Sequence, residues 1–494
     1  MDALSTESNL QTFPRSATQG KISGGSNPRR GADGKLCLGF RNLSDFDLFQ
    51  FQLRNPGDGR NRLSGSFPLG ILNLTKLSHI HLRDNELTGS FPPNMTSLSD
   101  LEEFDASGNR FVGAFPSSLL EIPSLTYIDL SGNQLRNFAD YGNIPPTSRL
   151  ENLYMGDNNF SGPIPMASIS KLVNLQVLVL SRWNTGGDAL DVSPLYHLKS
   201  LYYLHLSDLK MTTAIDLSLL SPLQSLSNLD LSGNRVSTAN ITSASDFSQQ
   251  LEALYMSGCN VTEFPLFLRT QRHLQVLDLS GNMIKGQVLD WLWRLPRLYH
   301  VNMSHNSLGS FQASSSQQMF PQSQLQRIDV SWNDFQGPLF IPPSHSIQYL
   351  GGSNNNFSGG IPQSVCSQTY LQFLDLSHNN FDGSVPRCLG NTIGSLIVLS
   401  LRHNRLSGTL PDIFVDANEL RSIDLSGNRL EGKLPKSLIN CSSLEVLNVA
   451  SNRIKDTFPF WLNSLKELQT ILLVGTQSLR RGQVMFRWGP CLFQ

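Results

Sequence analysis

The chain has 494 residues, and its 39 acidic and 38 basic side chains give a formal net charge of -1. This balance argues against a nucleic-acid-binding protein, which would carry a basic excess or a basic stripe. The sequence contains no run of about 18 apolar residues, so we expect no membrane-spanning helix within it, and its six cysteines are too few to build a disulfide-dominated fold of this length.

Residues 1–52 precede the first clear pattern in the chain. This segment is rich in Ser, Gly and Arg, as in Ser23–Arg30, and its start contains no apolar core of a secretory signal. We therefore predict that residues 1–52 are largely disordered and contain no recognisable cap for the elements that follow. The sequence in this segment gives no other structural signal.

From residue 53 to residue 473 the chain repeats one unit. The segment Leu274–Asn282 reads Leu-Gln-Val-Leu-Asp-Leu-Ser-Gly-Asn, and close copies of it begin at Leu226, Leu371 and Leu420. Looser copies keep the spacing near about 24 residues, within the range of leucine-rich repeats, so that about 17 copies account for most of the chain. Such an array overrides the usual expectation of about three separate domains for this length.

The first half of each unit predicts a short strand. In Leu-x-x-Leu-x-Leu the last two leucines are two residues apart, so both point to one face of the strand while the intervening side chains point to solvent. The Asn that follows turns the chain, and its amide can bind backbone groups that the turn exposes. Stacked repeats would align these amides into a ladder, and they would bury leucines that a single repeat cannot bury alone.

The second half of each unit predicts a bend and a convex turn. Asn355–Pro362 and Asn428–Pro435 follow the pattern Asn-x-Leu-x-Gly-x-Ile-Pro, in which Gly supplies a tight bend and Pro ends an extended piece. This half resembles the plant-type leucine-rich repeat. We therefore predict an α/β solenoid, a leucine-rich-repeat horseshoe with a parallel β-sheet on its concave face and short strands with 3-10 or helical turns on its convex side.

The segments Lys433–Asn448 and Asp456–Leu462 read KLPKSLINCSSLEVLN and DTFPFWL. They resemble the leucine-rich-repeat receptor-like proteins of plants, as do Glu263–Leu268 and Asp290–Trp293. Members of that family are cell-surface receptors of immunity and development that lack a kinase domain. The resemblance implies a place on the extracellular face of the plasma membrane, and signalling through a membrane receptor-like kinase as partner.

The resemblance also implies segments that we do not recognise in the sequence. Members of the family begin with a signal peptide and a cysteine-bearing cap, and they end with further repeats, an acidic stretch, one membrane helix and a short cytoplasmic tail. Residues 474–494 abandon the repeat and form a non-repeat tail. We therefore expect the ligand-recognition ectodomain of such a receptor, truncated, with a role in defence or developmental signalling.

Two other hypotheses remain open. The chain could be a soluble apoplastic inhibitor similar to the polygalacturonase-inhibiting proteins, which share this repeat, or an inert truncated gene product. The sequence contains no HExxH, GxxxxGK[ST], GxSxG or GxGxxG motif, and its periodic Asp residues occupy solvated scaffold positions. We therefore expect no enzyme activity, no cofactor and no metal.

The candidate binding residues are aromatic and imidazole side chains at exposed positions of the predicted concave face. Repeat proteins bind through this face, and large exposed aromatics are over-used at recognition hot spots. Tyr203 and His205, with Tyr154 and Tyr255 two repeats away on either side, would form a lateral stripe, and Trp332 lies further along. We predict that these residues bind a peptide, a protein or an oligosaccharide; ordinary strand propensity of tyrosine is the alternative explanation.

The same region breaks the repeat pattern. Trp183 and Leu209 occupy ladder positions where the pattern expects Asn, and Cys259 occupies a third such position. Departures from local consistency are found where function or strain overrides the pattern, and a benign loop excursion is the alternative.

Asn-x-Ser/Thr sequons predict glycosylation in a secreted protein. A sequon at Asn42 falls in the N-terminal segment, and one at Asn302 falls on a predicted concave strand, where a glycan would block the face near Tyr299 and His300. The candidate glycosylation sites are Asn73, Asn94, Asn159, Asn240, Asn260, Asn356 and Asn440.

Cys366 and Cys388 follow the prolines Pro362 and Pro386 by four and two residues, on the convex side of adjacent repeats. Neighbouring repeats stack at strand spacing, so the two Cα atoms can fall within the distance window of a disulfide, which we predict as possible. Cys441 occupies a position that packs inward in such repeats, and we expect a free buried thiol there.

Overall fold

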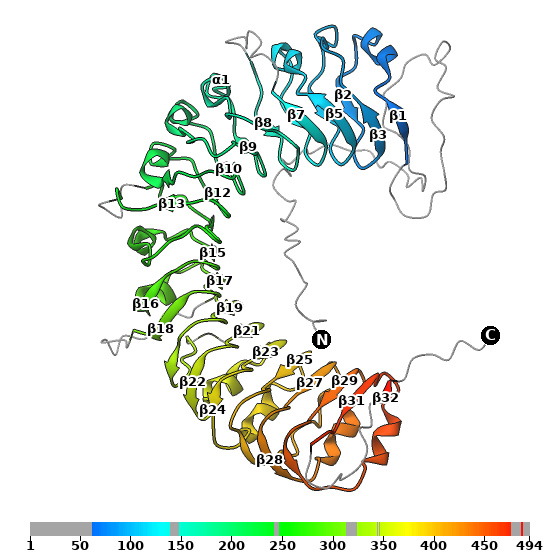
Figure 1. Ribbon diagram of the computed structural model, residues 1–494, viewed down its shortest axis with the longest axis vertical. Coiled ribbons are helices and arrows are strands. Elements are labelled where there is room, and N and C mark those ends of the chain that lie inside the picture. The colour runs from blue at the N-terminus through cyan, green and yellow to red at the C-terminus, as the bar shows by residue number, and fades with distance from the viewer. Residues whose placement is uncertain are drawn as a thin grey trace, which may run out of the picture.

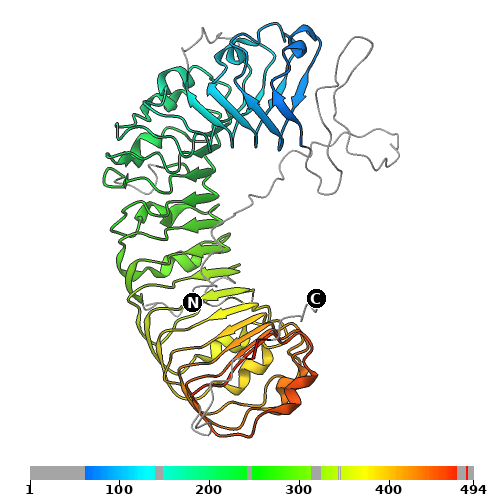
Figure 2. The same ribbon diagram turned by 45° about the vertical axis from the view of Figure 1, so that its right-hand side comes forward.

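The computed structural model describes residues 62–138, 148–241, 247–312, 324–342, 344 and 346–475, and the backbone of residues 486–487. The predicted segment 1–52, the sequon at Asn42 and most of the predicted tail 474–494 lie outside the described residues. The chain winds into a curved solenoid whose two ends face each other across an open hollow (Figure 1, Figure 2).

The inner side of the arc is one parallel sheet. Seventeen strands of the described residues pair in parallel, each with the corresponding strand of the next repeat. They are β2 (His79–His81), β4 (Glu103–Asp105), β6 (Tyr127–Asp129), β8 (Asn152–Tyr154), β9 (Val177–Val179), β10 (Tyr203–His205), β12 (Asn228–Asp230), β14 (Ala253–Tyr255), β15 (Val276–Asp278), β17 (His300–Asn302), β19 (Arg327–Asp329), β21 (Tyr349–Gly351), β23 (Phe373–Asp375), β25 (Val398–Ser400), β27 (Ser422–Asp424), β29 (Val446–Asn448) and β31 (Thr470–Leu472). The last strand, β31, also pairs in antiparallel orientation with β32 (Phe486–Arg487).

The register of this sheet confirms which leucines point inward. The central residue of each strand is opposite the central residue of its neighbours, as Leu204 is opposite Leu178 and Leu229. Leu254 and Leu399, both central residues, are buried. The buried apolar side chains form one continuous core from Leu63 to Leu465, so the described repeats share a single quasi-one-dimensional interior.

The asparagine ladder is also confirmed. The Oδ1 atom of Asn404 accepts a hydrogen bond from the backbone N–H of Phe381 in the preceding repeat, at 3.0 Å. Its Nδ2 atom donates to the carbonyl oxygens of Leu376, Leu401 and Arg402, at 2.9, 3.2 and 3.2 Å. The Oδ1 atom accepts a backbone N–H of the preceding repeat in the same way at Asn85, Asn109, Asn133, Asn158, Asn234, Asn282, Asn306, Asn333, Asn355, Asn379, Asn428 and Asn452.

At the three predicted departures from the ladder, the side chain that replaces asparagine packs into the core. Trp183 is 2% exposed, stacks on Phe160 and donates its indole N–H to the carbonyl of Gly162 at 2.9 Å. Leu209 is fully buried, and the Cys259 thiol donates to the carbonyl of Leu231 at 3.2 Å, which a ladder amide does elsewhere. All three side chains are therefore part of the core.

The outer side of the solenoid contains short strands and single helical turns. Figure 1 shows β16, β18, β22 and β24 on the outside of the arc, opposite β15, β17, β19 and β21. These additional strands are β1 (Ser64–Ser66), β3 (Glu86–Gly89), β5 (Arg110–Ala114), β7 (Gln134–Asn137), β11 (Ile215–Asp216), β13 (Val236–Ser237), β16 (Lys285–Val288), β18 (Ser307–Phe311), β20 (Gln336–Gly337), β22 (Asn356–Gly359), β24 (Asn380–Phe381), β26 (Ser407–Thr409), β28 (Arg429–Gly432) and β30 (Arg453–Ile454). They arise from the Leu-x-Gly half of each repeat, as predicted.

The convex turns begin directly after the proline of the pattern in most repeats, because proline ends the extended piece before them. The turns are η2 (Leu69–Asn73), η3 (Ser117–Glu121), α1 (Met166–Ile169), η4 (Ser193–His197), η5 (Leu217–Leu220), η6 (Leu266–Thr270), η7 (Asp290–Arg294), η8 (Gln363–Ser367), η9 (Arg387–Asn391), η10 (Lys436–Asn440) and η11 (Phe460–Ser464). The predicted class, a leucine-rich-repeat horseshoe with a concave parallel sheet, is confirmed. Within the described residues, none of these helices has the length and apolar character that a bilayer crossing requires.

Candidate ligand-binding face

The first and third residues of every inner strand face the hollow, because the central residue faces the core. In the third position, the register sets Tyr154, Val179, His205, Asp230 and Tyr255 side by side on five successive strands. Strands about 4.8 Å apart place Tyr154 and Tyr255 about 19 Å from each other. We call Tyr154, Tyr203, His205 and Tyr255 the tyrosine stripe.

His205 is held in the middle of the tyrosine stripe by polar contacts. Its Nε2 atom lies 3.3 Å from Oδ2 of Asp230 and 2.7 Å from Oγ of Ser207. The side chains of His205 and Asp230 are only 17% and 15% exposed, so both are largely withdrawn from water. The imidazole therefore presents a fixed edge to the hollow instead of a freely rotating ring.

The phenol groups of the stripe are close enough to affect one another. Burial raises the pKa of Tyr203, and the nearby Asp230 carboxylate and the phenols of Tyr154 and Tyr255 raise it further. Burial and the neighbouring Tyr299, Asp230 and Asp278 raise the pKa of Tyr255 to about 12. The stripe therefore presents neutral hydroxyl groups, which can donate as well as accept hydrogen bonds.

The concave face beyond the stripe carries Arg327 between His300 and Tyr349, on adjacent strands. The Arg327 guanidinium lies over the Tyr349 ring, 4.8 Å from its centroid. Burial and the Arg327 charge lower the pKa of His300 to about 4. His300 is therefore a neutral imidazole near neutral pH.

Trp332 is not part of the tyrosine stripe. It follows β19, three strands beyond β14, and it occupies the position directly before a ladder asparagine. At this position the backbone has positive φ, with glycine in some repeats, as at Gly281 with φ 63°, and a larger residue in others, as at Asp157 with φ 55°. We call this line of residues the left-handed row.

Five successive repeats have no glycine in the left-handed row. His305, Trp332, Asn354, His378 and His403 all have φ between 51° and 53°. Their rings stack in pairs: His305 on Trp332 with centroids 5.3 Å apart, and His378 on His403 with centroids 4.5 Å apart. Sequence reasoning missed this row, although its signal is visible in Ser-His-Asn and Ser-Trp-Asn, where the close copies of the pattern at Leu226, Leu274 and Leu420 have Ser-Gly-Asn.

Trp332 is the least expected member of the row. A bulky residue rarely adopts positive φ, and such strain persists mainly where function retains it. Its side chain is 54% exposed, so burial does not offset this strain. The indole therefore gains little from burial, and its role as a ligand-binding residue stays a prediction.

Replacement of Trp332 by glycine tests this prediction. We expect the free energy of unfolding to change by less than about 1 kcal/mol, because relief of about 1–2 kcal/mol of left-handed strain offsets the loss of stacking on His305, which is about 0.5–1.5 kcal/mol. The matched control Trp183→Gly removes a buried indole and should lower it by more than about 3 kcal/mol. Equal losses in both variants, measured by denaturant unfolding, would show that Trp332 is structural.

Imidazole and carboxylate groups also meet at the first strands of the sheet. The Nε2 atoms of His79 and His81 lie 3.7 and 3.3 Å from the two carboxylate oxygens of Glu103. Even so, no group of three or more His, Cys, Asp or Glu side chains among the described residues is placed to hold a metal ion. These contacts are histidine–carboxylate pairs on an exposed surface.

The candidate glycosylation sites Asn73, Asn94, Asn159, Asn240, Asn260, Asn356 and Asn440 are all exposed. Asn302 differs from them, because its side chain lies in the concave sheet. Its Nδ2 atom donates to Asp278 at 3.2 Å and its Oδ1 atom accepts from the Ser304 backbone N–H at 3.1 Å. Whether any sequon carries a glycan stays a prediction.

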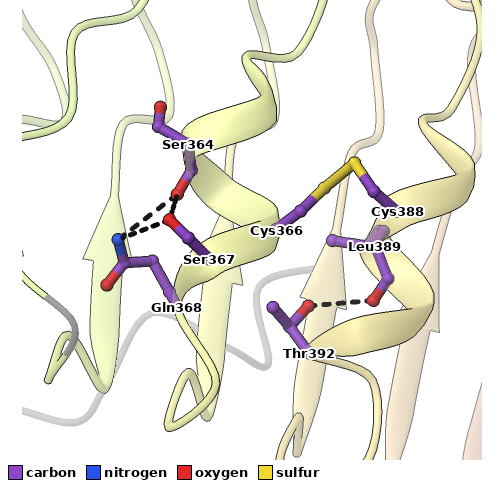
Figure 3. Close-up of a disulfide and its surroundings, with 7 residues drawn as sticks. All are labelled: Ser364, Cys366, Ser367, Gln368, Cys388, Leu389 and Thr392. Carbon is purple, nitrogen blue, oxygen red and sulfur yellow. Dashed lines mark hydrogen bonds between the residues drawn. A yellow bond between two sulfur atoms is a disulfide. The ribbon is translucent and has the colours of Figure 1, made fainter.

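On the convex side, Cys366 of η8 and Cys388 of η9 form a disulfide with Cα atoms 5.5 Å apart (Figure 3). Ser367 and Gln368 donate hydrogen bonds to the carbonyl of Ser364, and Thr392 donates to the carbonyl of Leu389, so both turns are internally braced. Cys441 is free and buried.

Known proteins match this chain over its repeat array. Family models described as leucine-rich repeats match residues 273–295, 369–430 and 440–457. Curated relatives from Arabidopsis thaliana include receptor-like protein 53, 53% identical over 308 residues, and receptor-like protein 18, 44% identical over 347 residues. The repeat array belongs to the leucine-rich-repeat receptor-like proteins of plants. The two alignments cover 62% and 68% of this chain. The chain therefore spans only 29% and 35% of the length of those two relatives.

Solved structures similar to this chain include plant ectodomains. One is the leucine-rich-repeat ectodomain of the membrane receptor kinase GASSHO1/SCHENGEN3 from Arabidopsis thaliana, in complex with Casparian strip integrity factor 2; it is 25% identical, with a TM-score of 0.65, over 84% of this chain and 49% of that one. Another is the Arabidopsis receptor kinase HAESA, in complex with the peptide hormone IDA and the co-receptor SERK1; it is 25% identical, with a TM-score of 0.57, over 84% of this chain and 77% of that one.

Proposed function

We propose that the chain is the ligand-recognition region of a plant cell-surface receptor-like protein that acts in defence or developmental signalling. The observation that carries this proposal is the tyrosine stripe, a set of half-buried rings and fixed polar groups in the middle of the concave sheet. The proposed role is binding, without catalysis. Signalling would pass to a membrane receptor-like kinase as partner.

An extended peptide is the ligand that suits this stripe best. The distance of about 19 Å from Tyr154 to Tyr255 corresponds to about six residues of extended peptide, at about 3.3 Å per residue. The ring faces offer apolar contact, and the hydroxyl groups and the His205 edge offer hydrogen bonds to a peptide backbone. The HAESA ectodomain, with the same fold, was solved with a peptide hormone, which supports a peptide here.

The double substitution Tyr203→Ala and His205→Ala tests the proposed site. Peptides selected from a displayed library on the full chain should bind this variant at least about tenfold more weakly, since aromatic hot spots carry about 2 kcal/mol or more of binding free energy. Binding is measured by calorimetry, together with the unfolding midpoint of each variant.

The convex turn directly before β10 supplies a matched control. Tyr196 and His197 lie on the convex turn η4 with their rings in contact, 3.7 Å between centroids, and Tyr196 is 46% exposed. Their double replacement by alanine removes the same two side-chain types from the opposite side of the solenoid, and it should leave peptide affinity unchanged. Equal affinity in both double variants would contradict the proposed site.

A further inference from the structure

A second hollow, separate from the concave space inside the arc, lies on the convex surface and is lined by three arginines. It has a volume of about 550 Å³ and lies between turns η6 and η7 and the loops that follow them. Arg269 and Arg272 come from the first of these repeats, and Asp290, Trp291 and Arg294 come from the second. A smaller hollow of about 300 Å³ adjoins it and shares Arg269 and Arg272, together with His273.

The lining of the larger hollow is strongly cationic. Its single carboxylate, Asp290, is already paired with Arg294 at 2.8 Å. Arg269 and Arg272 are exposed, and they leave an excess of two positive charges in the hollow. The chain as a whole has a net charge of -1, so the positive charge is concentrated locally.

This concentration is specific to two adjacent turns. Among the described 3-10 turns, only η6 and η7 carry an arginine in the last turn, and the strands that follow them pair as neighbours. One such arginine can be explained by the partial negative charge at the end of a helical turn. Arg272 lies outside both turns, so this explanation does not cover the cluster.

We propose that this hollow binds a saccharide that carries carboxylate or sulfate groups. Guanidinium groups bind oxyanions with two parallel hydrogen bonds, and arginine is the preferred residue for such sites. A volume of about 550 Å³ lies within the range of small-ligand pockets, about 300–1,000 Å³, and exceeds what a single inorganic anion fills. Trp291, packed edge-on against Phe264 with centroids 5.7 Å apart, adds an aromatic surface against which a sugar ring can pack.

The proposed saccharide site is separate from the peptide face, because it lies on the outside of the solenoid. It therefore does not depend on the proposed function. The concave variant Tyr203→Ala with His205→Ala should bind the saccharide as the unsubstituted chain does, so that failure of either proposal can be recognised separately.

The test uses the full chain and three probes: an oligosaccharide of galacturonate, the same oligosaccharide with its carboxylates methyl-esterified, and inorganic phosphate. Calorimetry should show binding of the acidic oligosaccharide that weakens with added salt, and at least about tenfold weaker binding of the ester and of phosphate. Equal binding of the ester would overturn the oxyanion site, and equally tight binding of phosphate would reduce it to an adventitious ion only.

The variants Arg269→Gln with Arg272→Gln should weaken binding of the acidic oligosaccharide by about tenfold or more, because they remove two charge-assisted contacts. The matched control is Arg387→Gln with Lys436→Gln, which removes the same charge from two other convex turns, η9 and η10. An equal loss of affinity in the control would show only general attraction to a basic surface and would overturn the proposal.

Discussion

Replacement of Leu279 by alanine is expected to lower the free energy of unfolding by about 2–5 kcal/mol. Leu279 is fully buried in the core and comes directly after β15. Its backbone N–H donates to the carbonyl of Asn302 at 2.8 Å, and this bond is kept in the variant. The loss therefore measures removed apolar contacts and the remaining cavity, because the flanking repeats cannot collapse without breaking their own register.

Denaturant unfolding of the full chain measures this loss, and Leu219→Ala is the matched control. Leu219 lies on the convex turn η5 and is 39% exposed, so its truncation should change the free energy of unfolding by less than about 1 kcal/mol. A loss below about 1 kcal/mol at Leu279 would mean that this leucine does not contribute to a continuous core.

Replacement of Asn404 by alanine should lower the free energy of unfolding by about 2–4 kcal/mol, because a buried backbone group left without a partner costs about 1–3 kcal/mol. The variant leaves the Phe381 N–H without its acceptor and removes the amide donor from the carbonyls of Leu376, Leu401 and Arg402. Both consequences fall on the contact between adjacent repeats, so the interface is weakened as well as the repeat.

The control for Asn404 is Asn391→Ala, at the exposed end of turn η9. Hydrogen exchange of the Phe381 amide adds a local readout. The exchange rate of this proton should rise in Asn404→Ala and should stay the same in the control. Slow exchange at Phe381 in the variant would mean that another group has replaced the ladder amide.

The fold followed from the sequence because one short pattern decides almost everything. Two leucines two residues apart identify the inner side of each strand, and the following asparagine identifies the turn, so the sheet, the ladder and the single core were all predicted correctly. The inward placement of Leu254 and Leu399 follows from the same rule. The array limits at residues 53 and 473, and the assignment of ligand-binding residues, remain predictions.

The left-handed row could not be predicted with the same rule. From the sequence alone, a histidine or tryptophan in place of glycine would be interpreted as a harmless substitution in a turn. Its meaning depends on φ, and on the stacking of Trp332 with His305 across two repeats. The convex arginines were missed for a related reason, because Arg269 and Arg294 come from different repeats and line one hollow only where two turns pack side by side.

The alternation of buried and exposed residues along each three-residue strand also has an evolutionary consequence. Leu204 contributes to the core, while Tyr203 and His205 on either side of it are half-buried and point to the concave surface of the sheet. Substitutions at the two flanking positions therefore disturb the fold less than substitutions at the central position. A lineage of such proteins can change its preferred ligand one strand at a time while the framework that displays it stays constant.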